Sequence, residues 1–125
     1  MTMSGKLLLF GFEDLPTILA AAAAVRPFGA EAVPVARQDY NKPLAVLAGL
    51  DDDPGTLMPF TGGPLGGRMA VLCGLDRHVD ALIPALQKAG ILCPKAVLTD
   101  TNRSWTPPAL LAELHRERAA LERRR

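Results

Sequence analysis

Apolar residues along the chain gather in two short runs that show no polar alternation. The first spans 6–12 (Lys-Leu-Leu-Leu-Phe-Gly-Phe) and the second spans 69–75 (Met-Ala-Val-Leu-Cys-Gly-Leu). A continuous apolar run of this length is typical of a strand that is covered on both faces. The pattern therefore predicts two buried strands that lie side by side in the centre of a sheet.

After each buried run the apolar spacing changes to the helical period. Asp14 occupies a favourable N-cap position and Pro16 stands in the first turn, where no N–H donor is needed. The apolar residues in 15–22 then recur at i, i+3, i+4 and i+7, which predicts a helix that ends near Gly29. The same spacing after Asp76 predicts a second amphipathic helix, with Asp76 as its cap.

The remaining elements follow from shorter signals. Segments 31–36 and 95–99 read as strands, and Pro34 places the former at a sheet edge because proline removes a ladder donor. Residues 43–50 predict a short helix. A last helix opens at Thr106 and Pro107, with its leucines inward and its charged residues outward. The leucines expected to face inward are Leu110, Leu111, Leu114 and Leu121.

The two halves of the chain repeat the same order of elements. Each reads strand, helix, strand, helix, so residues 1–125 are expected to form one domain of two internal repeats, about 6–50 and 68–115, joined by a linker at 51–67. This predicts an α/β fold: a duplicated βαβα unit with a four-stranded, largely parallel sheet of order 2-1-3-4 and helices on both faces. A ferredoxin-like mixed sheet is the alternative.

Composition narrows the class of protein. Half of the 125 residues are apolar and the formal net charge is +1, which argues for a globular domain and against a dedicated nucleic-acid binder. Apolar runs fall well short of the ~20 residues of a membrane helix. Two cysteines are too few for a disulfide framework, so a cytoplasmic location with no membrane contact is expected.

Several segments between Lys6 and about His115 carry distinctive sequence motifs in a characteristic order. They are 7–14, 39–49, 60–62, 69–75 and 95–102, the last followed by Trp105. Together they resemble the small bacterial proteins grouped as domain of unknown function 3783. The resemblance implies a stand-alone cytoplasmic bacterial protein and implies no activity. The stretch Gly62–Gly67 is richer in glycine than the linker typical of that family.

This glycine-rich stretch, followed by Arg68, approaches the spacing of a phosphate-binding P-loop. It precedes a predicted strand instead of following one, and it offers no hydroxyl for Mg²⁺, so we interpret it as a connector. His78 and His115 are isolated and Cys73 and Cys93 lack paired spacing. The sequence therefore predicts no catalytic set, no metal site and no cofactor.

Polar side chains follow the predicted strands, where an open parallel sheet binds ligands at its switch point. Some have structural explanations, since Asp76 suits a helix cap, Asn102 a turn and Trp105 an anchor for the last helix. The candidate ligand-binding residues are Glu13, Asp39, Tyr40, Asp76, Asp100, Asn102, Arg103 and Trp105.

Two functions remain open. The first is a small non-catalytic cytoplasmic binding or protein-interaction domain, with a homodimer formed through an edge strand or the last helix. The alternative is a small-molecule-binding protein or small enzyme that holds a small polar ligand at the carboxyl ends of the strands. Nucleic acid is not an expected partner.

Overall fold

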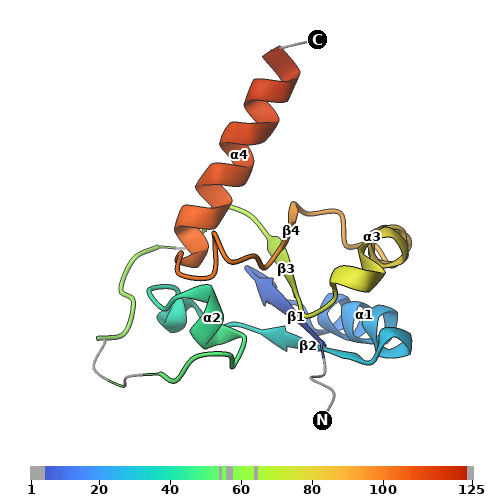
Figure 1. Cartoon of the computed structure of the whole chain (residues 1–125), viewed down its shortest axis with the longest axis horizontal. Helices are drawn as coiled ribbons and strands as arrows, with labels where there is room; N and C mark the ends of the chain where they lie inside the picture. The colour runs from blue at the N-terminus through green and yellow to red at the C-terminus, as the bar shows by residue number, and fades with distance from the viewer. Residues whose placement is uncertain (1–4, 54, 56–57, 64, 124–125) are drawn as a thin grey trace.

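A four-stranded mixed sheet in the order β2-β1-β3-β4 forms the centre of the molecule (Figure 1). Its strands are β1 (Gly5–Phe10), β2 (Ala30–Pro34), β3 (Met69–Cys73) and β4 (Lys95–Val97). The computed structural model describes residues 5–53, 55, 58–63 and 65–123. Parts of the predicted linker (54, 56–57 and 64) and the last two arginines lie outside these ranges.

The directions of the strands decide where their ends meet. β1 runs parallel to β2, and β3 runs parallel to β4, but β1 and β3 are antiparallel with Leu8 opposite Val71. The predicted strand order and the pairing of the two apolar runs are confirmed. The expectation of a parallel central pair is wrong, and on this point the sheet is mixed, as in the alternative fold.

The chain's path explains the antiparallel centre. β2 ends at the same edge of the sheet at which β3 begins, because Phe10 at the end of β1 lies opposite Met69 at the start of β3. In its described residues, the intervening segment has the four-residue helix α2 (Leu44–Leu47) and a 3-10 turn, and neither is long enough to carry the chain back to the opposite edge. Within the described residues, each half still reads strand, helix, strand, helix; that the halves are a duplicated unit stays a prediction.

Helices cover both faces of the sheet, as predicted. Helices α1 (Leu15–Val25) and α3 (Val79–Lys88) lie against one face and contact each other. Helices α2 and α4 (Pro107–Arg123) cover the other face (Figure 1). Consecutive residues of β1 and β3 therefore point into two separate cores, which is why neither strand shows a polar alternation. The side chains on the α1 side include Leu7, Leu9, Ala70 and Leu72, and those on the α4 side include Leu8, Phe10, Met69 and Val71.

The predicted caps at Asp14 and Asp76 do not form capping hydrogen bonds. Asp14 occupies the N-cap position of α1, but its carboxylate accepts from the hydroxyl of Thr17 and pairs with Arg68 instead of a backbone N–H. Asp76 begins a short 3-10 turn, Asp76–His78, that precedes α3. Both aspartates thus lie at helix starts, where their charge suits the helix dipole.

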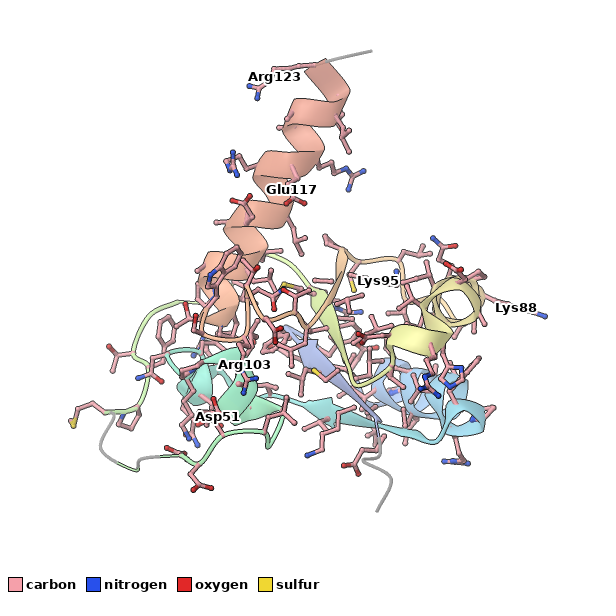
Figure 2. The ribbon with its side chains drawn as sticks, viewed as in Figure 1. Asp51, Lys88, Lys95, Arg103, Glu117 and Arg123 are labelled. Atoms are coloured by element: carbon pink, nitrogen blue, oxygen red, sulfur yellow. The ribbon has the colours of Figure 1, made fainter. Side chains whose placement is uncertain are left out.

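The last helix extends beyond the core on which its first half packs (Figure 1). Leu110 and Leu111 are buried, but Leu121 is 62% exposed, so the prediction that Leu121 faces inward is wrong. The half of α4 that carries Glu117 and Arg123 extends away from the sheet (Figures 1 and 2). Helical periodicity alone cannot show that the core ends before the helix does. Among the described residues, none of the helices has both the length and the apolar character needed to cross a bilayer.

Candidate functional site

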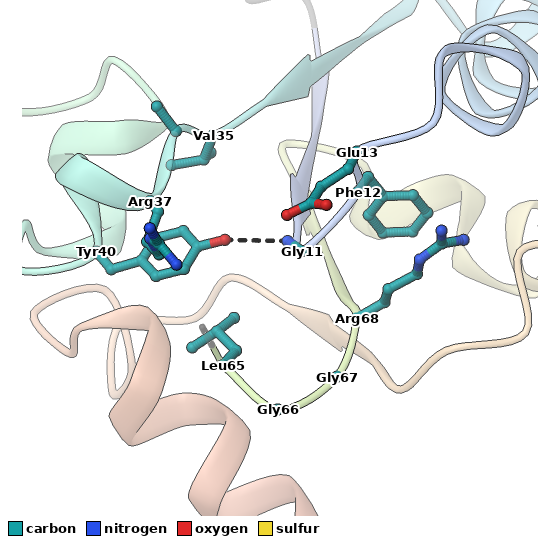
Figure 3. Close-up of a pocket in the computed structure, with 11 residues that line it drawn as sticks. Gly11, Phe12, Glu13, Val35, Arg37, Tyr40, Leu65, Gly66, Gly67 and Arg68 are labelled. Atoms are coloured by element: carbon teal, nitrogen blue, oxygen red, sulfur yellow. Dashed lines mark hydrogen bonds between the residues drawn. The ribbon is translucent and has the colours of Figure 1, made fainter. Parts of the chain in front are cut away.

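A cavity of about 610 Å³ lies at the edge of the sheet where β1 and β2 end and β3 begins (Figure 3). This is the place at which α/β proteins commonly hold ligands, beyond the carboxyl ends of neighbouring parallel strands. Three segments far apart in the sequence form its walls. They contribute Gly11, Phe12 and Glu13; Val35, Ala36, Arg37 and Tyr40; and Leu65, Gly66, Gly67 and Arg68.

The floor of the cavity depends on a close contact between two glycines. Gly11 follows β1 with φ at 79°, a left-handed conformation that glycine adopts without strain. A Cβ added at Gly11 would lie 2.6 Å from the carbonyl oxygen of Gly67. The glycine-rich segment is therefore more than a connector, since Gly66 and Gly67 form one wall of the cavity.

Tyr40 supplies a buried hydroxyl to the same cavity. The residue is 4% exposed, and its ring packs between Phe10 and Phe60, each with a centroid separation of 6.0 Å. Its hydroxyl oxygen accepts a hydrogen bond of 3.0 Å from the N–H of Gly11. In the described part of the chain its own proton has no acceptor, so the hydroxyl can donate to a ligand.

Arg68 forms the rim but is already engaged. Its guanidinium pairs with the carboxylate of Asp14 and lies 4.9 Å from the centre of the Phe12 ring, within cation–π range. The hydrogen bond from Thr17 and, to a lesser degree, the charge of Arg68 hold the pKa of Asp14 below its usual value. Arg68 and Asp14 thus neutralise each other at the edge of the cavity.

Glu13 and Arg37 are the two lining charges that have no ion-pair partner among the described residues. Both are solvent-accessible. Figure 3 shows the carboxylate of Glu13 pointing toward the side of the cavity from which Arg37 and Tyr40 come. The site therefore combines a cation, an anion and a hydroxyl donor around one space.

The antiparallel central pair divides the residues that the sequence placed together. Of the eight, Glu13 and Tyr40 line the cavity, whereas Asp39 beside them makes an ion pair of 3.0 Å with Lys42. The grouping of Asp76 with Glu13 was expected from a parallel centre, and it is wrong because β1 and β3 end at opposite edges of the sheet.

A second hollow, of about 400 Å³, lies at that opposite edge. Asp76, Asp100 and Arg103 line it together with Gly74 and Leu98, among others. Arg103 is held by an ion pair of 3.0 Å to Asp51, shown in Figure 2. Because its one arginine is already paired, the charged lining groups without an ion-pair partner in the described residues are two carboxylates, those of Asp76 and Asp100.

Asn102 and Trp105 have structural roles in the turn that joins β4 to α4. Asn102 is 8% exposed; its side chain accepts from the N–H of Thr99 at 2.9 Å and donates to the carbonyl of Val97 at 3.0 Å. Trp105 packs against the core beneath α4, and its carbonyl accepts from the N–H of Leu44 at 2.9 Å. Both contacts fit the turn and anchor interpretations better than ligand contact.

The two cysteine thiols, Cys73 and Cys93, lie outside the cavity. Burial raises the pKa of Cys73 to about 12 and also raises the pKa of Cys93. Among residues 5–53, 55, 58–63 and 65–123, groups of three or more His, Cys, Asp or Glu side chains that could hold a metal ion are absent. The cavity contains groups that can orient a ligand, whereas Cys73 is buried and Cys93 is half-buried elsewhere in the protein.

Sequence reasoning missed Arg37 and the glycine wall. Arg37 stands in a 3-10 turn, Arg37–Asp39, just after β2, and nothing in its local pattern separates it from other exposed arginines. The density of glycine at 62–67 was a usable signal, because glycine permits another backbone to approach closely. Comparison with a P-loop drew attention to phosphate chemistry instead of to that close approach.

Comparison with known proteins gives one finding. Residues 68–121, which run from the start of β3 into the free half of α4, match the family model described as Domain of unknown function (DUF3783). Searches of curated proteins and of solved structures find no significant match. Most of the cavity lies outside the matched segment, which contributes only Arg68 to its walls.

Proposed function

Residues 68–121 match the family model described as Domain of unknown function (DUF3783), whose description assigns no activity, so we propose a function from the chemistry of the cavity. The protein is a non-catalytic binding domain that holds a small polar molecule at the carboxyl ends of β1 and β2. The cavity, at about 610 Å³, falls within the size range of small-molecule sites.

The observation that carries this proposal is the convergence of three available polar groups on one cavity. The Tyr40 hydroxyl is buried, positioned by the Gly11 N–H, and keeps a proton to donate. Arg37 and Glu13 line the same space without ion-pair partners in the described chain. Polar groups left available in this way recognise a ligand with little reorganisation.

Titration of the ¹⁵N-labelled 125-residue chain with a set of small polar metabolites tests this proposal. We expect amide shifts at Gly11, Gly66 and Gly67 for the compounds that bind. Ala36 lines the cavity and is exposed, so Ala36→Trp should block binding by filling the space. Ala81 is exposed on α3, away from the cavity, and Ala81→Trp should leave binding unchanged.

Three outcomes would overturn the proposal. The first is that no compound shifts the amides of the cavity walls. In the second, the shifts gather at Asp76 and Asp100 on the opposite edge instead. The third is chemical conversion of a bound compound during the titration, which would contradict a purely non-catalytic role.

A second candidate function is self-association, which the free half of α4 favours. Leu121 lies on the same stripe of the helix as Leu114, whose side chain packs against the core, and it is left exposed. Glu117 and Arg118 are adjacent at the middle of this free half, and the ion pair that Arg118 makes with Glu122 is long, at 3.5 Å, and exposed. An antiparallel second copy can therefore bring Glu117 of one copy beside Arg118 of the other. The occupant proposed for this face is therefore a second copy of this chain.

Sedimentation velocity over a range of concentrations tests self-association. We expect a dimer that Leu121→Glu converts to a monomer, because a charge replaces the apolar contact. Ala119→Glu places the same charge on an exposed position off the stripe and should keep the dimer. A protein that sediments as a monomer at every concentration refutes this candidate.

A further inference from the structure

We infer that the ligand of the cavity is a zwitterion of the amino-acid class, with its carboxylate at Arg37 and Tyr40 and its ammonium group at Glu13. This inference rests on the proposed binding function and specifies the ligand. It follows from the charges, the donors and the apolar surface that line the space.

The balance of charge excludes a strongly anionic ligand. Arg68 is neutralised by Asp14, which leaves one cation, Arg37, and one anion, Glu13, available among the described lining residues. A phosphate group would bring up to two negative charges to a site with one free guanidinium and a carboxylate that repels it. A zwitterion has no net charge and offers each side chain its complement.

The donors on one side of the cavity suit a carboxylate. The planar guanidinium of Arg37 can donate two parallel hydrogen bonds to the two oxygens of a carboxylate. The Tyr40 hydroxyl, fixed by the 3.0 Å bond from Gly11, can add a third donor. Figure 3 shows Arg37 and Tyr40 together on this side.

The other side of the cavity suits an ammonium group. The carboxylate of Glu13 points into the space, and within the described chain it accepts no side-chain or backbone hydrogen bond from the protein (Figure 3). A carboxylate accepts only, so its ligand must donate, and a protonated amine supplies both the donors and the opposite charge.

The rest of the wall is apolar. Phe12, Val35 and Leu65 also line the cavity. An aliphatic side chain on the ligand would cover this surface and displace its water, which adds to the affinity. L-leucine combines the three features and is therefore the first probe.

The experiment compares three probes that differ in one charge each. L-Leucine carries both groups, 4-methylpentanoate lacks the amine, and 3-methylbutan-1-amine lacks the carboxylate. Binding to the whole 125-residue chain is measured at pH 7 by amide shifts and calorimetry. We expect L-leucine to bind at least about tenfold more tightly than either singly charged relative.

Two charge-neutralising variants assign the groups. Glu13→Gln should reduce L-leucine binding and leave 4-methylpentanoate binding unchanged or stronger. Arg37→Gln should weaken the binding of L-leucine and of 4-methylpentanoate, which both carry a carboxylate, and leave the binding of 3-methylbutan-1-amine unchanged. Glu31→Gln and Arg26→Gln remove the same charges from exposed positions that do not line the cavity, so they should leave L-leucine binding intact.

The outcomes separate this inference from the proposed function. If 4-methylpentanoate binds as tightly as L-leucine, or Glu13→Gln leaves L-leucine binding unchanged, the zwitterion is wrong although the cavity still binds. The zwitterion is also wrong if inorganic phosphate binds more tightly than L-leucine. It is wrong as well if other metabolites bind at the cavity and L-leucine does not. Absence of binding by every metabolite overturns the proposed function itself.

Discussion

Replacing Gly11 by alanine tests the contact that shapes the cavity. Gly11 adopts φ 79°, and its added Cβ would lie 2.6 Å from the carbonyl oxygen of Gly67. Because that oxygen belongs to the backbone, it cannot rotate away as a side chain would. The N–H of Gly11 also donates to Tyr40, so a shift of either segment disturbs the positioned hydroxyl.

The expected loss of stability has two parts. The left-handed conformation costs a residue with a Cβ about 1–2 kcal/mol. Forcing the additional carbon against the neighbouring backbone costs a further ~1–3 kcal/mol. The combined loss of about 2–5 kcal/mol is a large share of the roughly 5–15 kcal/mol that stabilises a typical domain.

Gly29 provides a matched control on the other side of the molecule. It has φ 73°, yet no heavy atom lies within 4 Å of its added Cβ, so Gly29→Ala should lose only the conformational part, about 1–2 kcal/mol. Urea unfolding followed by the fluorescence of Trp105, the single tryptophan, measures both variants. We expect Gly11→Ala to unfold at a clearly lower urea concentration.

Equal losses in the two variants would refute the reasoning. That result would mean that the segment after β1 does not rest against Gly67 in solution. A second measurement on the same samples strengthens the test, because Gly11→Ala should also abolish ligand-induced amide shifts at the cavity. Gly29→Ala should retain them.

Two further predictions concern titratable groups. The pKa of Asp14 lies below its usual value because Thr17 and, secondarily, Arg68 stabilise its carboxylate. The contribution of Asp14 to the stability of the fold is therefore present above the pKa of the unfolded state and is lost as pH falls through the pKa of the folded state. Carboxyl NMR titration should show that Thr17→Val and Arg68→Gln each raise this pKa, and an unchanged value in both contradicts the geometry. Burial raises the pKa of Cys73 to about 12 and leaves Cys93 the more accessible thiol. Disulfide-exchange reagents should therefore modify Cys93 first in the native protein, and Cys93→Ser should remove the faster phase of the reaction. Loss of the faster phase in Cys73→Ser instead would contradict the burial order.

Local sequence patterns predict much of the fold. The apolar runs 6–12 and 69–75 contain the two central strands, and Pro34 marks an edge strand, because burial on two faces and a missing donor act on the residues themselves. The start of α1 and the start of α4 likewise follow from prolines in the first helical turn. These features depend on neighbours within a few positions.

Half of the candidate site was also within reach of the sequence. Glu13 and Tyr40 were expected near the ends of the first two strands, and they line the cavity. Arg37 and Gly67 were not expected there, because their role arises from the segments that fold beside them. The sequence of an exposed arginine is the same whether it faces solvent or a ligand. The same holds for a glycine-rich segment.

The relative direction of β1 and β3 was decided by the tertiary structure alone. An apolar strand packs equally well beside a parallel or an antiparallel neighbour, so its residues do not record which way that neighbour runs. Here the path from β2 stays at one edge, β3 enters there, and Asp76 and Asp100 are carried to the far edge. The sequence by itself determined the central strands, their burial and the presence of the helices. Only the folded chain determined how far each helix is covered and which polar groups share a cavity, because both depend on the arrangement of the whole sheet.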